Sequence, residues 1–257
     1  YGKNKNRKTE IKTFESIDAK KVVIANKKLY VNKEEGFIGT SLRKDEFVCD
    51  CSDIDDIITF KEDGSMKVVK IDGKVFVGKG IIHCAVFKKK DERTIYNVIY
   101  KNGLTGNTMM KRFPVRSITR NKDYSITKSA KGSKVIYFTA NSNGEAESVT
   151  VSLKKTTKQK ALKIEVNFAK LNIKGKESAG NIVTKSLVNK VEFKTIGIST
   201  LSARKIWFDD NVQRLNVDQR GEILGAFKPN DKILTILQTG EIELKTFDIS
   251  NHFDENM

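Results

Sequence analysis

Residues 55–71 read DDIITFKEDGSMKVVKI, two short apolar runs on either side of a polar turn. The turn contains Asp63-Gly64, and lysines alternate with apolar residues in the second run. An Asp-Gly pair between two such runs is a strong sequence signal for a β-hairpin. A lone hairpin is at best marginally stable in water. The stretch therefore predicts a larger β-structure in which this hairpin is one element.

The same pattern returns near the other end of the chain, at 231–247, which reads DKILTILQTGEIELKTF. Ile236 occupies the position of Phe60, and Gly240 occupies the position of Gly64. The second run alternates apolar and charged residues, which is the period of a half-buried strand. Two matching hairpins predict a repeat protein.

Three looser copies complete the predicted series of five hairpins, at 94–113, 134–153 and 205–217. Residues 154–204 are expected to insert extra strands, and simpler strands are expected at 20–26, 29–32, 36–42, 74–78, 81–87 and 221–227. Helical periodicity is nearly absent. Successive four-stranded units predict an all-β, propeller-like ring of five or six blades. A β-sandwich whose hairpins are alike by chance is the alternative.

Composition limits the functional classes. The 257 residues include 31% charged residues, and no apolar run approaches the roughly 18 residues that suggest a membrane span, so no membrane partner is expected. Residues 81–205 hold 26 basic and 8 acidic residues, a net charge of +18, whereas residues 206–257 have a net charge of −5. This separation predicts a path for a polyanion along one side of the molecule.

The cysteines raise the question of a metal site. Cys49, Cys51 and the pair His83-Cys84 are the candidate ligands. Neither a CxxC nor an HxxxH spacing supports them, and cysteines two apart in a strand share one face as small buried apolar groups. We therefore expect no metal. Three cysteines, an odd number, do not form a disulfide framework and favour a cytosolic protein.

The repeats resemble the C-terminal domain of the A subunit of bacterial type IIA topoisomerases, DNA gyrase and topoisomerase IV. GFIGTSL (36–42) followed by the first hairpin, and GEILGAF (221–227) followed by the last, are similar to the family repeat. KGKESAGNIVTK (174–185) is similar to its Gly-Arg-x-Ala-x-Gly segment, with Lys176 at the arginine position. The resemblance spans essentially the whole chain. It implies a β-pinwheel, in which neighbouring blades exchange strands and a basic outer rim binds and bends double-stranded DNA without reading its sequence.

The resemblance also implies a setting. The chain, 1–257, is then a single DNA-binding domain and a fragment of a longer protein, with 1–20 holding the linker from the catalytic core and the first strand. The stretch 40–53 lacks the Gly-rich basic box of gyrase and has only Arg43 and Lys44 as basic residues. This departure favours topoisomerase IV. The parent enzyme would be bacterial and cytoplasmic, at the nucleoid. Regions outside this chain would use ATP and Mg²⁺. Other such regions would bind the ATPase B subunit and a second A subunit.

Catalytic residues are not expected within the chain itself, nor is a cofactor. The family's strand-cleaving tyrosine follows an arginine, and none of the six tyrosines here does so. A phosphate-binding GxxxxGK[ST] loop is absent from the sequence. Asp55-Asp56 and Asp209-Asp210 fit strand entries and turns rather than an acid–base couple.

Binding to phosphates is the remaining chemistry, and it needs basic side chains but no base-reading groups. The lysine- and arginine-rich stretch 111–134, the segment 174–185 and the end of the basic region supply the candidates. The predicted DNA-binding residues are Lys111, Arg112, Arg116, Arg120, Lys174, Lys176, Lys185 and Arg204. The alternative is a propeller-type platform for an acidic protein partner; an enzyme acting on anionic polysaccharide lacks convergent catalytic residues.

Overall fold

A computed structural model describes residues 26–104, 106–128, 131–155, 162–228, 231–249 and 251–254. These residues form twenty β-strands and a single 3-10 turn, Phe168–Lys170. The expected linker and first strand at 1–20, and nearly all of the strand expected at 20–26, lie outside the described residues. No helix in the described part of the chain is long and apolar enough to cross a membrane.

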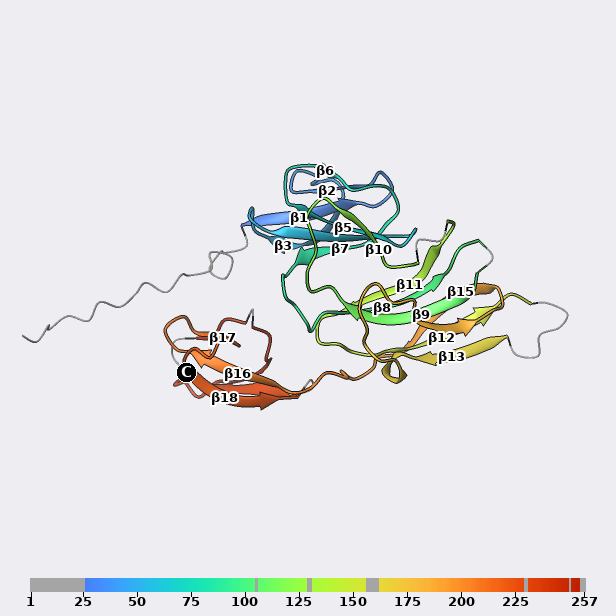
Figure 1. The fold of residues 1–257 in the computed structure, drawn as a ribbon. Helices are drawn as coiled ribbons and strands as arrows, with labels where there is room; N and C mark the ends of the chain where they lie inside the picture. Colours follow the sequence, from blue (N-terminus) through green and yellow to red (C-terminus); the bar gives the residue numbers. More distant parts are fainter. Residues whose placement is uncertain are drawn as a thin grey trace, which may run out of the picture.

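The strands form six small sheets, which we call blades 1 to 6 (Figure 1). In spatial order, blade 1 contains β3 (Glu46–Cys51), β1 (Lys27–Asn32), β2 (Phe37–Gly39) and β6 (Val75–Phe76). Blade 2 contains β10 (Asp123–Ser125), β5 (Ser65–Lys70), β4 (Asp56–Lys61) and β7 (Ile81–Phe87). Blade 3 contains β11 (Lys134–Asn141), β8 (Ile95–Lys101), β9 (Thr108–Pro114) and β14 (Asn181–Thr184).

The last three blades are smaller. Blade 4 contains β13 (Lys163–Asn167), β12 (Ser148–Leu153) and β15 (Val188–Thr195). Blade 5 contains β17 (Arg214–Asn216), β16 (Arg204–Asp209) and β18 (Glu222–Phe227), and blade 6 contains only β19 (Lys232–Ile236) and β20 (Ile242–Thr246). Six sheets agree with the upper predicted blade count, but only the first three blades have the predicted four strands.

One connection rule repeats along the chain. After the hairpin of one blade, the chain returns to add a strand to the hairpin of the blade before it. Thus β6 pairs with β2, β10 with β5, and β14 with β9, and after the last hairpin His252 forms a bridge with Arg214 of β17. This is the strand exchange that distinguishes a pinwheel from a simple propeller.

Blade 4 is the exception to this rule. No strand added after the β16–β17 hairpin pairs with β13 in the described residues, so the strand exchange from blade 5 to blade 4 is missing. The face of blade 4 that points away from blade 3 is also polar. It carries Thr150, Ser152, Lys163, Glu165, Lys190 and Glu192, which are cross-strand neighbours. Among the residues that the structure describes, neither backbone pairing nor apolar packing of this kind joins blades 4 and 5.

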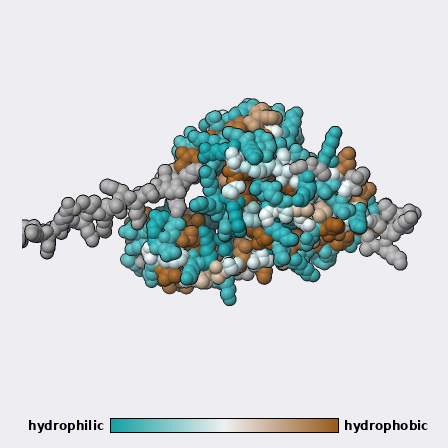
Figure 2. Space-filling view, viewed as in Figure 1, coloured by the Kyte–Doolittle hydropathy of each residue, from teal (hydrophilic) through white to brown (hydrophobic). Residues whose placement is uncertain are grey.

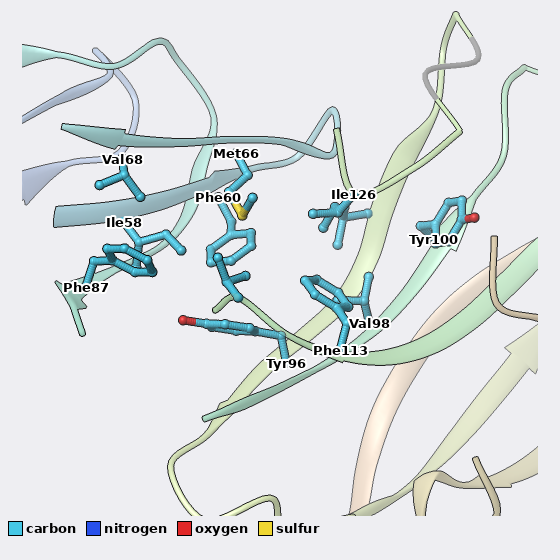
Figure 3. Packing of buried hydrophobic residues seen from close by; sticks show 12 residues of the cluster. Ile58, Phe60, Met66, Val68, Phe87, Tyr96, Val98, Tyr100, Phe113 and Ile126 are labelled. Carbon is cyan, nitrogen blue, oxygen red and sulfur yellow. The ribbon is translucent and has the colours of Figure 1, made fainter. Parts of the chain in front are cut away.

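Apolar side chains fill the seams between the other neighbours. Separate buried clusters lie between blades 1 and 2, between blades 2 and 3, between blades 3 and 4, and between blades 5 and 6. Figure 3 shows the second of these, in which Ile58 and Phe60 of blade 2 pack with Tyr96 and Val98 of blade 3. Successive side chains of a strand point to opposite faces of the sheet. Blade 2 therefore has one apolar face toward blade 1 and another toward blade 3.

Four of the five predicted hairpins are confirmed, because the strands within 55–71, 94–113, 205–217 and 231–247 pair as expected. The hairpin at 134–153 is wrong. β11 pairs with β8 in blade 3, whereas β12 pairs with β13 and β15 in blade 4. The Gly144 turn therefore carries the chain from one blade to the next. The backbone after this turn bonds to a distant segment, since Ala146 N–H donates to Ile198 O at 3.1 Å.

Candidate nucleic-acid interface

A tyrosine flanked by ammonium groups packs against the cluster between blades 2 and 3. Tyr124 is on β10, and the Nζ atoms of Lys122 and Lys176 lie 5.5 Å and 5.2 Å from its ring centroid, within cation–π distance. The backbone N–H of Thr119 donates to the tyrosine oxygen at 3.0 Å. Hydrogen bonds with Thr119, first that of its side chain and then that of its backbone N–H, lower the pKa of Tyr124, and the charges of Lys122 and Lys176 act in the same direction.

Further lysines lie near this ring, because the charge of Lys128 acts on Lys111 and Lys174 lines a hollow shared with Lys111. Lys128 and Lys174 are exposed, and Lys176 is half-buried. Within the part of the chain that the structure describes, Lys122, Lys128 and Lys174 form no ion pair with an acidic side chain, and Lys176 pairs with the exposed Glu177 at 3.1 Å. We call Lys122, Tyr124, Lys128, Lys174 and Lys176 the basic seam. The charges of Lys122, Lys128 and Lys174 are therefore available to an external anion.

Lys111 supports this surface from below instead of belonging to it. Its side chain is only 3% exposed, and its Nζ donates to the carbonyl oxygens of Lys176 and Ser178 at 2.7 Å and 3.0 Å. Burial lowers the pKa of Lys111 to about 8. The prediction that Lys111 contacts DNA is therefore wrong, because its ammonium group anchors the loop that presents Lys174 and Lys176.

The prediction that Arg112 contacts DNA is also wrong. It is 1% exposed, and its guanidinium group donates to Asn97 Oδ1, Thr200 Oγ1 and Gly144 O, each at 2.9 Å. Burial lowers its pKa, while the charge of Glu147 opposes that shift. The reason is topological. β9 lies between β8 and β14, so successive side chains point into the seams on its two sides and not to the rim.

The remaining candidates lie in different places. Arg116 is largely exposed and pairs with Glu92 at 3.2 Å, whereas Arg120 pairs with the buried carboxylate of Asp56 at 2.6 Å. Lys185 is exposed just beyond β14. Arg204 is half-buried in blade 5, where burial lowers its pKa. The structure thus brings Lys174 and Lys176 together with Lys122, Tyr124 and Lys128, which the sequence analysis did not select.

A small hollow adjoins the basic seam. It is lined in part by Lys111, Lys170, Lys174 and Ser178, which come from β9 and from the chain between blades 4 and 3. The Ser178 hydroxyl is buried and has no hydrogen-bond partner among the described residues. A hydroxyl and exposed ammonium groups are the donor types that contact phosphate oxygens.

The sheet of blade 2 separates His83 from the three cysteines among the candidate metal ligands. Cys51 and Cys84 belong to the core between blades 1 and 2. His83 points the other way, toward Phe60 and Phe138, with ring centroids 6.0 Å and 5.3 Å away. Burial lowers the pKa of His83 to about 4. The described residues contain no group of three or more His, Cys, Asp or Glu placed to hold a metal ion.

Two solved structures are similar to this chain at a low level. A solved structure described as the C-terminal domain of DNA topoisomerase IV covers 89% of this chain and 86% of its own, with a TM-score of 0.46 and 10% identity. A DNA gyrase A C-terminal domain covers 86% and 89%, with a TM-score of 0.28 and 11% identity. Neither likeness is close enough to locate a residue of the site.

Sequence relationships are more informative. The A subunit of DNA topoisomerase 4 from Borreliella burgdorferi is 30% identical over 196 residues, which cover 76% of this chain and 29% of that protein. The chain thus spans less than a third of that relative. The family described as "Topoisomerase C-terminal domain, Bacteroidota" matches residues 28–195 and 214–257, most of the chain. The chain therefore belongs to the family of C-terminal domains found in the A subunits of bacterial type IIA topoisomerases.

Proposed function

We propose that this domain binds and bends duplex DNA without cleaving it, and that the basic seam is the centre of the contact. The observation that carries the proposal is the pair of lysines around Tyr124, the exposed Lys122 and the half-buried Lys176, within a region of net charge +18. Phosphate contacts of this kind release counterions and supply affinity that is independent of sequence. The tyrosine ring fixes the positions of two ammonium groups along the path.

The composition of the first blade favours a bend in the DNA rather than a complete wrap around the domain. Residues 40–53 hold four acidic residues and only Arg43 and Lys44, so phosphates are not attracted there. Bending a site of 20–30 base pairs costs on the order of 1–6 kcal/mol, which phosphate contacts on blades 2 to 4 can offset. We propose that the parent enzyme is topoisomerase IV rather than gyrase, active in the bacterial cytoplasm. The domain would present DNA to the strand-passage core, while ATP, Mg²⁺ and the other A and B subunits engage other regions.

A charge-matched pair of variants tests the location. One variant carries Lys122→Gln, Lys128→Gln and Lys176→Gln, and its control carries Arg214→Gln, Lys228→Gln and Lys232→Gln, which are exposed residues of the acidic segment. Affinity for duplexes of unrelated sequence is measured by titration at several salt concentrations. The first variant should reduce the magnitude of the salt slope by about 2–3, because each phosphate contact contributes roughly 0.9.

The control should retain nearly the full slope. Equal losses in both variants would place the contact elsewhere. Affinity of the unmodified domain that does not change with salt would overturn DNA binding and favour the acidic-protein platform.

A further inference from the structure

The last hairpin exposes a face that its counterpart in blade 2 buries. The exposed face consists of Leu234, Ile236, Ile242 and Leu244, which are cross-strand partners. By sequence match these occupy the positions of Ile58, Phe60, Met66 and Val68. The four residues of blade 6 are 56–68% exposed, whereas the four residues of blade 2 are 0% exposed. We call the four exposed side chains of blade 6 the aliphatic face.

The counterpart shows what such a face is for. In blade 2 these side chains pack on Tyr96 and Val98 of blade 3, so they form the surface that one blade offers to the next (Figure 3). No blade follows blade 6 in the described residues. Figure 2 shows apolar patches in the part of the molecule that contains blades 5 and 6. The aliphatic face is therefore built like an internal seam but lacks the blade that would cover it.

In the described part of the chain, blade 1 leaves the opposite side of the repeat uncovered. Its Leu29, Val31 and Ile38 face blade 2. The other side of the same sheet carries four aromatic side chains, since Tyr30 pairs with Phe47 and Phe37 pairs with Phe76 across adjacent strands. Their ring centroids are 5.8 Å and 5.2 Å apart, and Phe47 and Phe76 are 50% and 60% exposed. We call these four residues the aromatic face; it is the side on which a preceding blade would pack.

The interruption between blades 4 and 5 separates the two parts that carry these faces. Residues 196–203 connect β15 to β16, while the exchanged strand and an apolar seam are both missing at this junction in the described residues. Figure 1 draws blade 1 and the sheet of blade 5 on the same side of the molecule, to the left of blades 3 and 4. Blades 5 and 6 share their own core, built on Ile206, Leu215, Phe247 and Phe253.

We propose that blades 5 and 6 act as one module that closes onto blade 1 of the same chain, with the aliphatic face docked on the aromatic face. The ring is then joined through the seam between blades 6 and 1, while the seam between blades 4 and 5 remains the weak one. Same-chain docking is favoured because the 196–203 connection keeps the two faces at a high effective concentration. The two faces are also the forward and backward sides of the repeat, as at every packed seam.

Cross-linking within the full 257-residue chain tests the closure. Lys74→Cys lies beside the aromatic face, because Lys74 Nζ is 4.1 Å from the Phe37 ring, and Glu241→Cys lies next to Ile242. Cys49→Ser removes the native cysteine that is not buried, since Cys51 and Cys84 are buried. A short bis-maleimide should give an intrachain link whose yield does not change with protein concentration. Peptide mass spectrometry identifies the linked pair.

Two variants with the same number of new charges decide the outcome. Ile242→Asp with Leu244→Asp should lower the yield by about tenfold, because apolar burial is lost from the docked form. The control, Val212→Asp with Ile223→Asp, alters residues of similar exposure in the same module and should stay within about twofold. Circular dichroism verifies that each variant is folded. Equal yields in the two variants would overturn the proposal, and so would links that form only between chains, which would identify a second copy as the occupant.

Discussion

Blades 1–4 and blades 5–6 use the same sequence repeat with different results. The hairpins β4–β5 and β19–β20 match position by position, yet the first is enclosed by apolar neighbours and the second keeps one apolar face exposed. The difference arises outside the hairpins. Blade 2 has a following blade and an exchanged strand, β10, whereas blade 6 has neither in the described residues. A repeat thus specifies which face is apolar, and the neighbouring repeats determine whether that face is buried.

The single tryptophan allows the unfolding of blades 5 and 6 to be followed separately from that of the whole chain. Trp207 is on β16 in blade 5, so its fluorescence reports blades 5 and 6. The circular dichroism signal, by contrast, comes from strands throughout the chain. Urea unfolding followed by both methods therefore distinguishes a change in one region from a change in the other.

The largest expected contrast comes from truncating matched residues of the two hairpins. Phe60→Ala should lower the free energy of unfolding by about 3–5 kcal/mol, because it leaves a cavity in the filled seam between blades 2 and 3. Ile236→Ala should cost at most about 2 kcal/mol, because that side chain is largely exposed in the structure and gains apolar contacts only where the aliphatic face docks on blade 1. The comparison fails if the two variants lose similar stability, or if Phe60→Ala shifts the Trp207 transition as much as the dichroism transition.

The buried arginine provides the next test, at the seam between blades 3 and 4. Arg112→Met keeps the volume but leaves Asn97 Oδ1, Gly144 O and Thr200 Oγ1 without a donor, so we expect a loss of about 3 kcal/mol. Arg204→Met is the matched control in blade 5, where the guanidinium is half-buried, and about 1 kcal/mol or less is expected there. A loss for Arg204→Met equal to that for Arg112→Met would show that the two regions are held together in the same way.

The sequence was a good guide where local chemistry determines structure. Alternation and glycine turns identified four hairpins, and Gly64 and Gly240 have the positive φ angles, +79° and +86°, that the shared turn requires. Strand exchange followed from the family resemblance and not from local pattern. The 134–153 error has the same origin, because a turn at Gly144 looks alike whether the chain reverses or crosses to the next blade.

The site was predictable only in part. Composition located the basic region, and Lys174 and Lys176 do lie in the basic seam. Strand register determined the rest, since Lys111 and Arg112 look like surface residues until β9 is paired on both sides. Tyr124, between Lys122 and Lys128, was the signal that the sequence analysis missed. An aromatic residue among lysines marks a position where charges can be fixed by a ring.

Acid should weaken the two regions unequally. The pKa of His83 is lowered to about 4 by burial, with a smaller effect from the Lys33 charge, compared with an ordinary value of 6.5. Between these two values the unfolded chain binds a proton that the folded chain does not. Stability is therefore complete above about pH 6.5 and falls as the pH is lowered toward 4, by roughly 2–3 kcal/mol.

His83→Phe should remove this part of the acid sensitivity while keeping an aromatic ring beside Phe60 and Phe138. Urea midpoints by circular dichroism are compared with those of the parent at pH 7 and pH 4, so that carboxylates common to both proteins cancel. His252→Phe is the control in the C-terminal region. Identical acid sensitivity in the parent and His83→Phe would show that this seam does not exclude the imidazolium.

The smallest contrast concerns the two equivalent turn glycines. Both have positive φ, which costs an L-residue about 1 kcal/mol or more. A Cβ at Gly64 also comes within 2.4 Å of Thr127 Cγ2, whereas a Cβ at Gly240 meets nothing within 4 Å. We therefore expect Gly64→Ala to cost about 2 kcal/mol and Gly240→Ala about 1 kcal/mol, read by circular dichroism and by Trp207 fluorescence respectively.

Thr127→Ser separates the two contributions at Gly64, because serine lacks the Cγ2 methyl group that the new Cβ would meet. In the Gly64→Ala background it should restore about 1 kcal/mol, the steric part, and leave the backbone strain that the two turns share. The same Thr127→Ser change in the parent measures the cost of losing the methyl group alone. Equal losses for Gly64→Ala and Gly240→Ala, with no rescue by Thr127→Ser, would mean that the segment following β10 adds nothing to the turn. The contrast between the enclosed and the open hairpin would then be confined to their strands.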